Sequence, residues 1–187
     1  MLFSLIINHI QADRLRILLA TAMLLLVSRA TGEPQETVSG PILDYQDTQL
    51  IIGSAAQVLL KQNTSNTLLG YCANKFKHLS QSAHTASNDW QQKHAKVISK
   101  AKAINRYVGK IIETHDSTFA AEKFQLKIDS QVYDSTQKFK DEMAIKSRKQ
   151  QHYLCNRLIL STAMGEWDLV NTIPEHFQRV NEFKLKE

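Results

Sequence analysis

Apolar residues recur at seven-residue intervals through the middle of the chain. Between residues 69 and 111 every seventh position is apolar, and further apolar residues stand three or four positions away. One unbroken heptad phase is typical of a long α-helix with a single buried face. The pattern therefore predicts one long helix, with a kink or frayed turn in the Ser-, Thr- and Asn-rich stretch 80–88. Its heptad positions are Leu69, Phe76, Ala83, Trp90, Val97, Ile104 and Ile111.

Shorter patterns on either side predict the remaining helices. Residues 45–62 have the spacing of an amphipathic helix, which we expect to end in the polar run 63–66. Residues 113–117 predict a turn, with Asp116 or Ser117 as the N-cap of a second long helix. That helix is expected to break near Ser147, to resume, and to stop at Gly165. The following tail, which contains Trp167, is expected to fold back over an end of the bundle.

No segment shows the period-two alternation of a strand, and glycine and proline are few. The prediction is an all-α fold, a long antiparallel helical hairpin or small helical bundle with one extra N-terminal helix. We expect residues 45–187 to form this single domain.

The N-terminal residues have the pattern of an export signal. Arg14 and Arg16 precede an apolar run over 17–27, and Ser28 and Ala30 place small residues before a cleavage point at Thr31. A run of this length is too short for a stable bilayer span, so we interpret residues 1–30 as a signal peptide and 31–44 as a flexible lead-in. The alternative is an uncleaved membrane anchor, because the first ten residues are also apolar.

Cys72 and Cys155 are the two cysteines of the chain. An even number in an exported protein favours a disulfide. If residues 69–164 form an antiparallel hairpin, these cysteines face each other when the turn is centred between Glu113 and Thr114. That position adjoins the turn predicted independently from polar composition. The same register places Leu69 near Leu158 and His78 near Lys149. It also places Ile104 near Lys123 and Phe124, and Trp90 near Gln137 and Phe139.

The charge is mildly basic. The whole chain carries +5, and removal of residues 1–30 leaves +3. This balance does not approach that of a nucleic-acid-binding protein. Several lysines dot the long helix, so we regard them as a candidate basic binding face for acidic envelope polymers or envelope proteins, or as an ordinary solvated surface. They are Lys93, Lys96, Lys100 and Lys110.

Motifs for catalysis, cofactors and metals are missing from the sequence. No nucleophile motif, glycine-rich phosphate loop or haem-attachment motif occurs. The histidines lack acidic partners at the spacing of a helical metal site, and the hairpin register puts a repelling lysine beside His78. We therefore predict no catalytic, cofactor or metal residues.

The resulting hypothesis is an exported, non-enzymatic helical protein of the cell envelope, periplasmic or secreted, that acts as a binding, chaperone-like or structural module. The alternative hypothesis is a ligand- or metal-binding helical bundle with possible enzymatic activity.

Intact mass of the protein from its native host tests the N-terminal and cysteine predictions together. We expect a chain that begins at Thr31 and is lighter than its reduced form by the two hydrogen atoms that a disulfide lacks. A full-length mass with two alkylatable thiols would contradict both.

Overall fold

The structure is a computed structural model that describes residues 45–185. The chain divides into two compact units, Met1–Tyr45 and Gln46–Glu187, and the second is described by itself. The signal peptide and lead-in expected over residues 1–44 lie outside the described residues.

The described residues are mostly helical and contain no strand, which confirms the all-α prediction. Six α-helices and one short 3-10 helix follow one another within residues 45–185. They are α2 (Tyr45–Lys75), η1 (Lys77–Leu79), α3 (Ser80–His115), α4 (Thr118–Ala144), α5 (Arg148–Ala163), α6 (Leu169–Thr172) and α7 (Pro174–Glu182).

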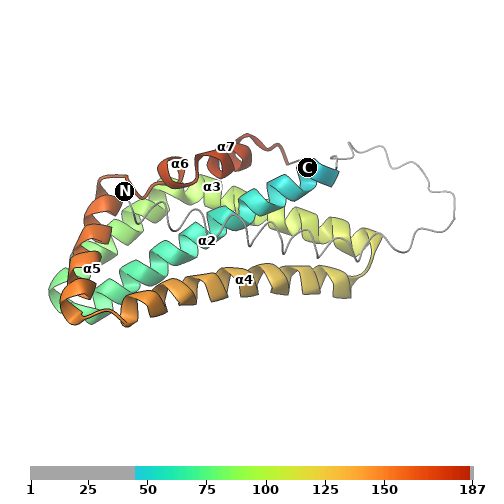
Figure 1. Ribbon diagram of the computed structural model, residues 1–187. Coiled ribbons are helices and arrows are strands. Elements are labelled where there is room, and N and C mark those ends of the chain that lie inside the picture. Colours follow the sequence, from blue (N-terminus) through green and yellow to red (C-terminus); the bar gives the residue numbers. More distant parts are fainter. Residues whose placement is uncertain (1–44, 186–187) are drawn as a thin grey trace, which may run out of the picture. The chain divides into compact units, whose positions relative to one another are not determined.

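The helices form a bundle around an antiparallel hairpin of α3 and α4 (Figure 1). Helix α2 lies along this hairpin, and α5 runs across the end where α2 meets α3. Helices α6 and α7 lie along α3. The tail therefore covers a side of the bundle, whereas the sequence predicted that it covers an end.

The first helix is longer than predicted. Helix α2 continues through the polar run 63–66 and ends at Lys75. Thr64 and Ser65 are buried, and the Ser65 hydroxyl accepts a hydrogen bond of 2.6 Å from the indole nitrogen of Trp167. This tertiary contact outweighs the tendency of short polar side chains to end a helix.

The prediction of one helix through all seven heptad positions is wrong, because the backbone leaves the helical conformation at Phe76. This residue is extended, with φ −127° and ψ 93°, and its side chain is buried. Leu69 therefore belongs to α2, while the positions from Ala83 onward belong to α3. Leu79, the N-cap of α3, makes no side-chain capping bond, so the local sequence carries no signal for this boundary.

The predicted kink over residues 80–88 does not occur, because this stretch is regular helix. Ala83 and Ala86 face the core, while Ser82, His84 and Thr85 are exposed. The stretch is therefore the amphipathic first part of α3, with alanines as its buried face.

Three predicted boundaries are confirmed. The Ser117 hydroxyl caps α4 by accepting from the Ala120 amide, and Ser147 forms a capping box with Gln150 at the start of α5. Gly165 follows α5 with φ 79°, a conformation that glycine adopts without strain. A Cβ at this position would also lie 2.9 Å from the Asp168 carboxylate.

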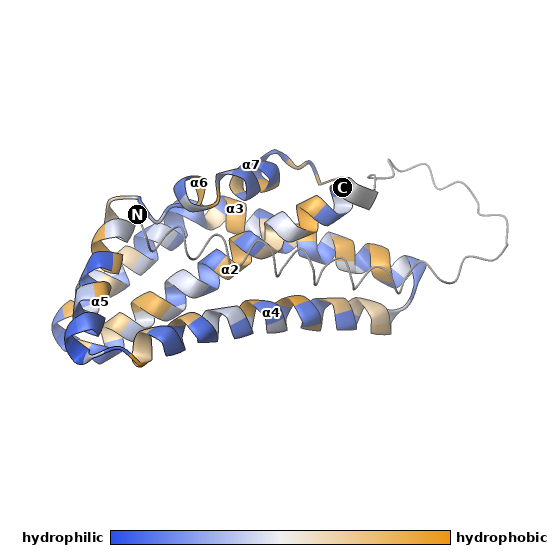
Figure 2. Ribbon diagram, viewed as in Figure 1, coloured by the Kyte–Doolittle hydropathy of each residue, from blue (hydrophilic) through white to orange (hydrophobic). Residues whose placement is uncertain are grey.

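Apolar and hydrophilic residues alternate along the long helices (Figure 2), and the buried ones form three clusters. Leu69 and Leu158 share the cluster around the cysteines, as predicted. Trp90 is core, but its cluster contains Leu169 and Val180 of the tail, whereas Phe139 packs against the cysteine cluster. The hairpin register predicted from the cysteines is wrong, because Cys72 lies in α2 and Cys155 in α5, and neither belongs to the α3–α4 hairpin.

Candidate functional site

The disulfide predicted from the cysteine count is present. Cys72 in the last turn of α2 is bonded to Cys155 of α5, with an S–S distance of 2.11 Å and a Cα–Cα distance of 5.4 Å. Both residues are fully buried. The two cysteines are 83 residues apart in the sequence, so the bridge links helices that are distant along the chain.

The tail covers part of the predicted basic face. The Lys93 ammonium pairs with the Asp168 carboxylate, and the Lys100 ammonium donates to the carbonyl of Asn181. Lys96 and Lys110 are exposed. Two of the four lysines thus hold the tail, and the structure does not present the four as one open surface.

Asp168 is the centre of a buried polar cluster. Its second carboxylate oxygen lies 3.0 Å from Nε2 of His94, whose ring packs against Trp90. Burial alone raises the pKa of the Asp168 carboxyl, but the hydrogen bonds from Lys93 and His94, together with their charges, outweigh it and lower the pKa below 3.8. The carboxylate form is therefore the one that the fold stabilises.

Trp167 joins the tail to both α2 and α3. Its carbonyl accepts a 3.1 Å hydrogen bond from the indole nitrogen of Trp90. The Lys61 ammonium lies 3.1 Å from the centre of the Trp167 ring. Burial lowers the pKa of Lys61 to about 7, while the indole face opposes this shift because it favours the charged form.

A groove of about 350 Å³ lies between α2, α3 and α4. Helix α3 contributes Lys102, Asn105 and Arg106, which share a helix face because they are three and four residues apart. The remaining lining residues come from α2 and α4 and are mostly polar. They are Leu59, Gln62, Asn63, Gln125, Asp129 and Val132.

Asn105 is the most unusual residue of this groove. Its side chain is 3% exposed, and neither its amide nitrogen nor its amide oxygen has a hydrogen-bond partner. More than about 90% of buried polar groups in folded proteins are paired. At the rim, the Asp129 carboxylate accepts a 3.0 Å bond from Gln125. The groove therefore offers a ligand an unpaired amide, two cations and one carboxylate.

Helix α4 carries a stripe of exposed large apolar residues. Phe119, Leu126 and Tyr133 are 73%, 69% and 62% exposed. They are seven residues apart, so they lie on one side of the helix and span about 21 Å. Large apolar residues aligned on a surface mark sites where proteins bind one another.

His78 and His152 meet, although the sequence placed His78 near Lys149. Their Nε2 atoms are 2.9 Å apart. Within the described residues, no three side chains of His, Cys, Asp or Glu gather as a metal site would require.

Two other His contacts each include a buried partner. His94, beside Asp168, is 5% exposed. Ser54, beside His176, is fully buried and donates its hydroxyl hydrogen to the Leu50 carbonyl. Neither arrangement presents its reactive atoms to a substrate in solution.

No helix within residues 45–185 is both long enough and apolar enough to span a membrane. In comparisons with known proteins, no family model, curated protein or solved structure matches the chain.

The sequence-based predictions included neither the groove around Asn105 nor the apolar stripe on α4. The stripe on α4 could have been found, because Phe119, Leu126 and Tyr133 repeat every seven residues. The groove could not, because a single asparagine beside a heptad position gives no sign of whether its amide is paired.

Asp168→Asn tests the polar cluster under the tail. A carboxyl whose pKa is lowered by folding contributes stability that is present above its ordinary value of 3.8 and is lost as the pH falls through its folded value. We expect the variant to lose about 2 kcal/mol of unfolding free energy at pH 7. The difference should shrink below pH 3.8.

Urea denaturation from pH 2 to pH 8 measures this difference, with the exposed Asp134→Asn as the matched control. A loss that stays constant over the whole range would show that the Asp168 charge does not stabilise the fold.

Proposed function

We propose that the chain is an exported, non-enzymatic helical binding module of the cell envelope, and that it binds a small polar ligand in the groove around Asn105. The observation that carries the proposal is the buried Asn105 amide, unpaired on both of its polar atoms. An unsatisfied buried polar group costs about 1–3 kcal/mol. A ligand that pairs with the amide would offset this loss.

The charges around the amide indicate the ligand's chemistry. Lys102 and Arg106 flank Asn105 on α3 and favour an anionic group. Asp129, on the opposite wall, disfavours a second anion and accepts from a donor. We therefore assign the groove to a small zwitterion, with a carboxylate toward α3 and an amino group toward α4. Binding should weaken as salt is added.

The placement in the envelope rests on other features. The N-terminal residues have the pattern of an export signal, and buried disulfides such as Cys72–Cys155 persist in oxidising compartments. Both features support export and neither depends on the groove.

Asn105→Leu tests whether the Asn105 amide is kept for ligand binding or contributes to the stability of the fold. If the ligand-free amide is unpaired, leucine should raise the unfolding free energy by about 1 kcal/mol, because it removes a buried polar group without a large change in volume. The exposed Asn88→Leu on the same helix is the control and should have no such effect. Chemical denaturation measures both variants.

Ligand binding in the groove is measured by NMR titration of the labelled protein. The ligands are free glutamine, glutamate, lysine and alanyl-alanine. We expect at least one of these zwitterions to shift the Asn105 side-chain amide signals, and Asn105→Leu to abolish the associated backbone shifts. A destabilised Asn105→Leu together with unmoved amide signals would mean that Asn105 is structurally paired by water, and would reject the proposal.

The stripe on α4 favours a second, structural role, in which α4 pairs with α4 of a second copy. Glu122 and Asp129 lie on one side of the stripe and Lys123 lies on the other. An antiparallel pair would set Glu122 against Asp129 of the other copy, whereas a parallel pair sets Lys123 against Glu122 of the other copy. The charges therefore favour the parallel twofold arrangement.

Sedimentation equilibrium at high protein concentration tests this pairing. One helix face is small compared with the roughly 1,200–2,000 Å² buried in stable complexes, so we expect weak dimers. Leu126→Glu should abolish them, Lys123→Glu should weaken them, and Lys123→Glu with Glu122→Lys should restore them.

Lys96→Glu makes the same charge change on α3, outside the stripe of α4, and should have little effect. A monomeric wild-type protein, or a double variant that fails to restore association, would reject self-pairing.

A further inference from the structure

Helix α5 presents an apolar strip on its outer face. Tyr153, Leu160 and Met164 are 62%, 60% and 67% exposed. A helix turns by about 100° per residue, so these three side chains lie within about 40° of one another around the helix axis. The side of α5 that carries the buried Cys155 and Leu158 is the opposite one. The strip therefore faces away from the core that holds the helix in place.

Two cations border this strip. By the same helical spacing, Lys149 lies about 20° beyond one edge of the apolar residues and Arg157 about 20° beyond the other. Both side chains are exposed. Long basic side chains lay their alkyl stems along apolar surface and keep their charged ends in a polar layer. The outer face of α5 thus has an apolar centre between two cationic edges.

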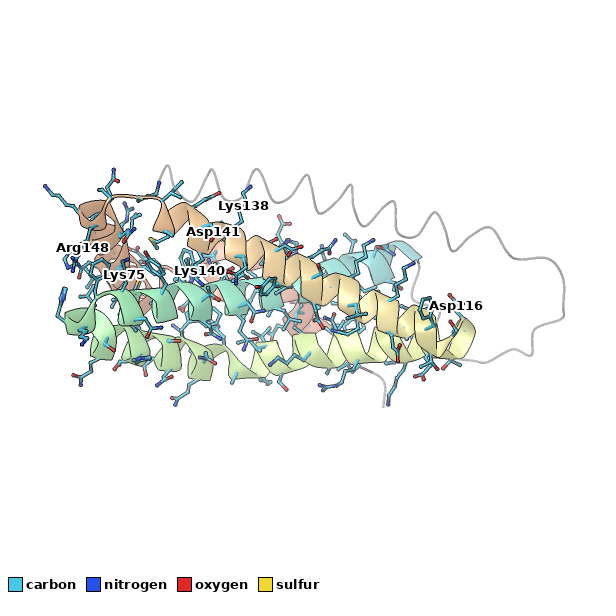
Figure 3. All side chains as sticks on the ribbon, turned by 90° about the horizontal axis from the view of Figure 1, so that it is seen from below. Lys75, Asp116, Lys138, Lys140, Asp141 and Arg148 are labelled. Atoms are coloured by element: carbon cyan, nitrogen blue, oxygen red, sulfur yellow. A yellow bond between two sulfur atoms is a disulfide. The ribbon has the colours of Figure 1, made fainter. Side chains whose placement is uncertain are left out.

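Acidic residues are missing from this part of the sequence. No aspartate or glutamate occurs between Glu142 and Glu166, while basic residues recur there. Arg148, in the first turn of α5, lies at the same end of the bundle as Lys75, and Asp116 lies at the opposite end (Figure 3). Both Arg148 and Lys75 are exposed. Positive charge therefore surrounds the apolar strip at this end of the bundle.

The charges around the two exposed apolar surfaces differ. The stripe on α4 is bordered by Glu122 and Asp129, which repel an anionic surface. The strip on α5 has cations on both borders and attracts one. A narrow apolar strip between long basic side chains also matches the layers of a bilayer surface, in which acyl chains lie beneath anionic phosphates.

We infer that the outer face of α5 binds the surface of an anionic phospholipid bilayer. The apolar side chains of Tyr153, Leu160 and Met164 enter the boundary between headgroups and acyl chains. Lys149 and Arg157 remain at the level of the phosphates. Three apolar side chains bury little area, so binding is reversible and depends on the lipid charge. The inference depends neither on the groove around Asn105 nor on the pairing of α4.

Vesicles that contain a headgroup-labelled nitroxide lipid test this contact. One preparation is phosphatidylcholine alone, and the other is equal parts phosphatidylcholine and phosphatidylglycerol. The full-length protein carries isotope-labelled methionine methyl groups, with exposed Met164 as the probe and buried Met143 as the internal reference. We expect the Met164 signal to broaden strongly on the anionic vesicles and little on the neutral ones. The Met143 signal should broaden less, and added salt should reverse the effect.

Two variants separate the apolar from the electrostatic contribution. A cation near an anionic leaflet raises binding about fivefold, so Arg157→Gln should lower the occupancy of anionic vesicles by about that factor below saturation. Leu160→Asn should lower it at least as much, because it removes a central apolar side chain. Circular dichroism verifies that both variants are folded.

Leu50→Asn on α2 and Lys138→Gln on α4 are the matched controls, because both residues are exposed and lie outside α5. All variants share the same N-terminal residues, so differences between them report on α5. A Met164 signal that does not broaden, or broadens equally on both lipids, would overturn the inference. Broadening that Arg157→Gln and Leu160→Asn leave unchanged would overturn it as well.

Discussion

The disulfide between Cys72 and Cys155 is the constraint around which the bundle is arranged. It fixes the last turn of α2 against α5, although α3 and α4 lie between these helices in the chain. The cluster around it contains three buried alanines, Ala73, Ala83 and Ala86, together with larger apolar residues such as Leu69 and Leu158. The bridge therefore lies inside a continuous apolar core. By the chain-entropy argument a loop of this length stabilises the fold by about 4 kcal/mol.

The two ends of the α3–α4 hairpin differ in the side chains that they hold. At the disulfide end, cross-link and aromatic packing fix the positions of side chains such as His78 and His152. Farther along the hairpin, both polar atoms of the Asn105 side chain remain unpaired in a groove. The candidate binding site thus uses a polar group that the packing leaves unsatisfied.

Periodicity and capping chemistry predicted much of the fold. The hairpin turn, the caps at Ser117 and Ser147, the stop at Gly165 and the disulfide all follow from local patterns or cysteine arithmetic. The break at Phe76 does not, because no glycine, proline or cap marks it and the side chain's burial decides it. Contacts between residues distant in the sequence also decided that α2 passes through Ser65, and they brought His78 to His152.

The tail has a consequence for the order in which the protein can fold. Leu169 and Val180 are fully buried in the central cluster, beside residues of α2 and α3 such as Val58 and Ala101. During synthesis α2 and α3 therefore emerge with an open apolar flank, which α6 and α7 close once they have been made. The complete core cannot form before translation has passed Val180.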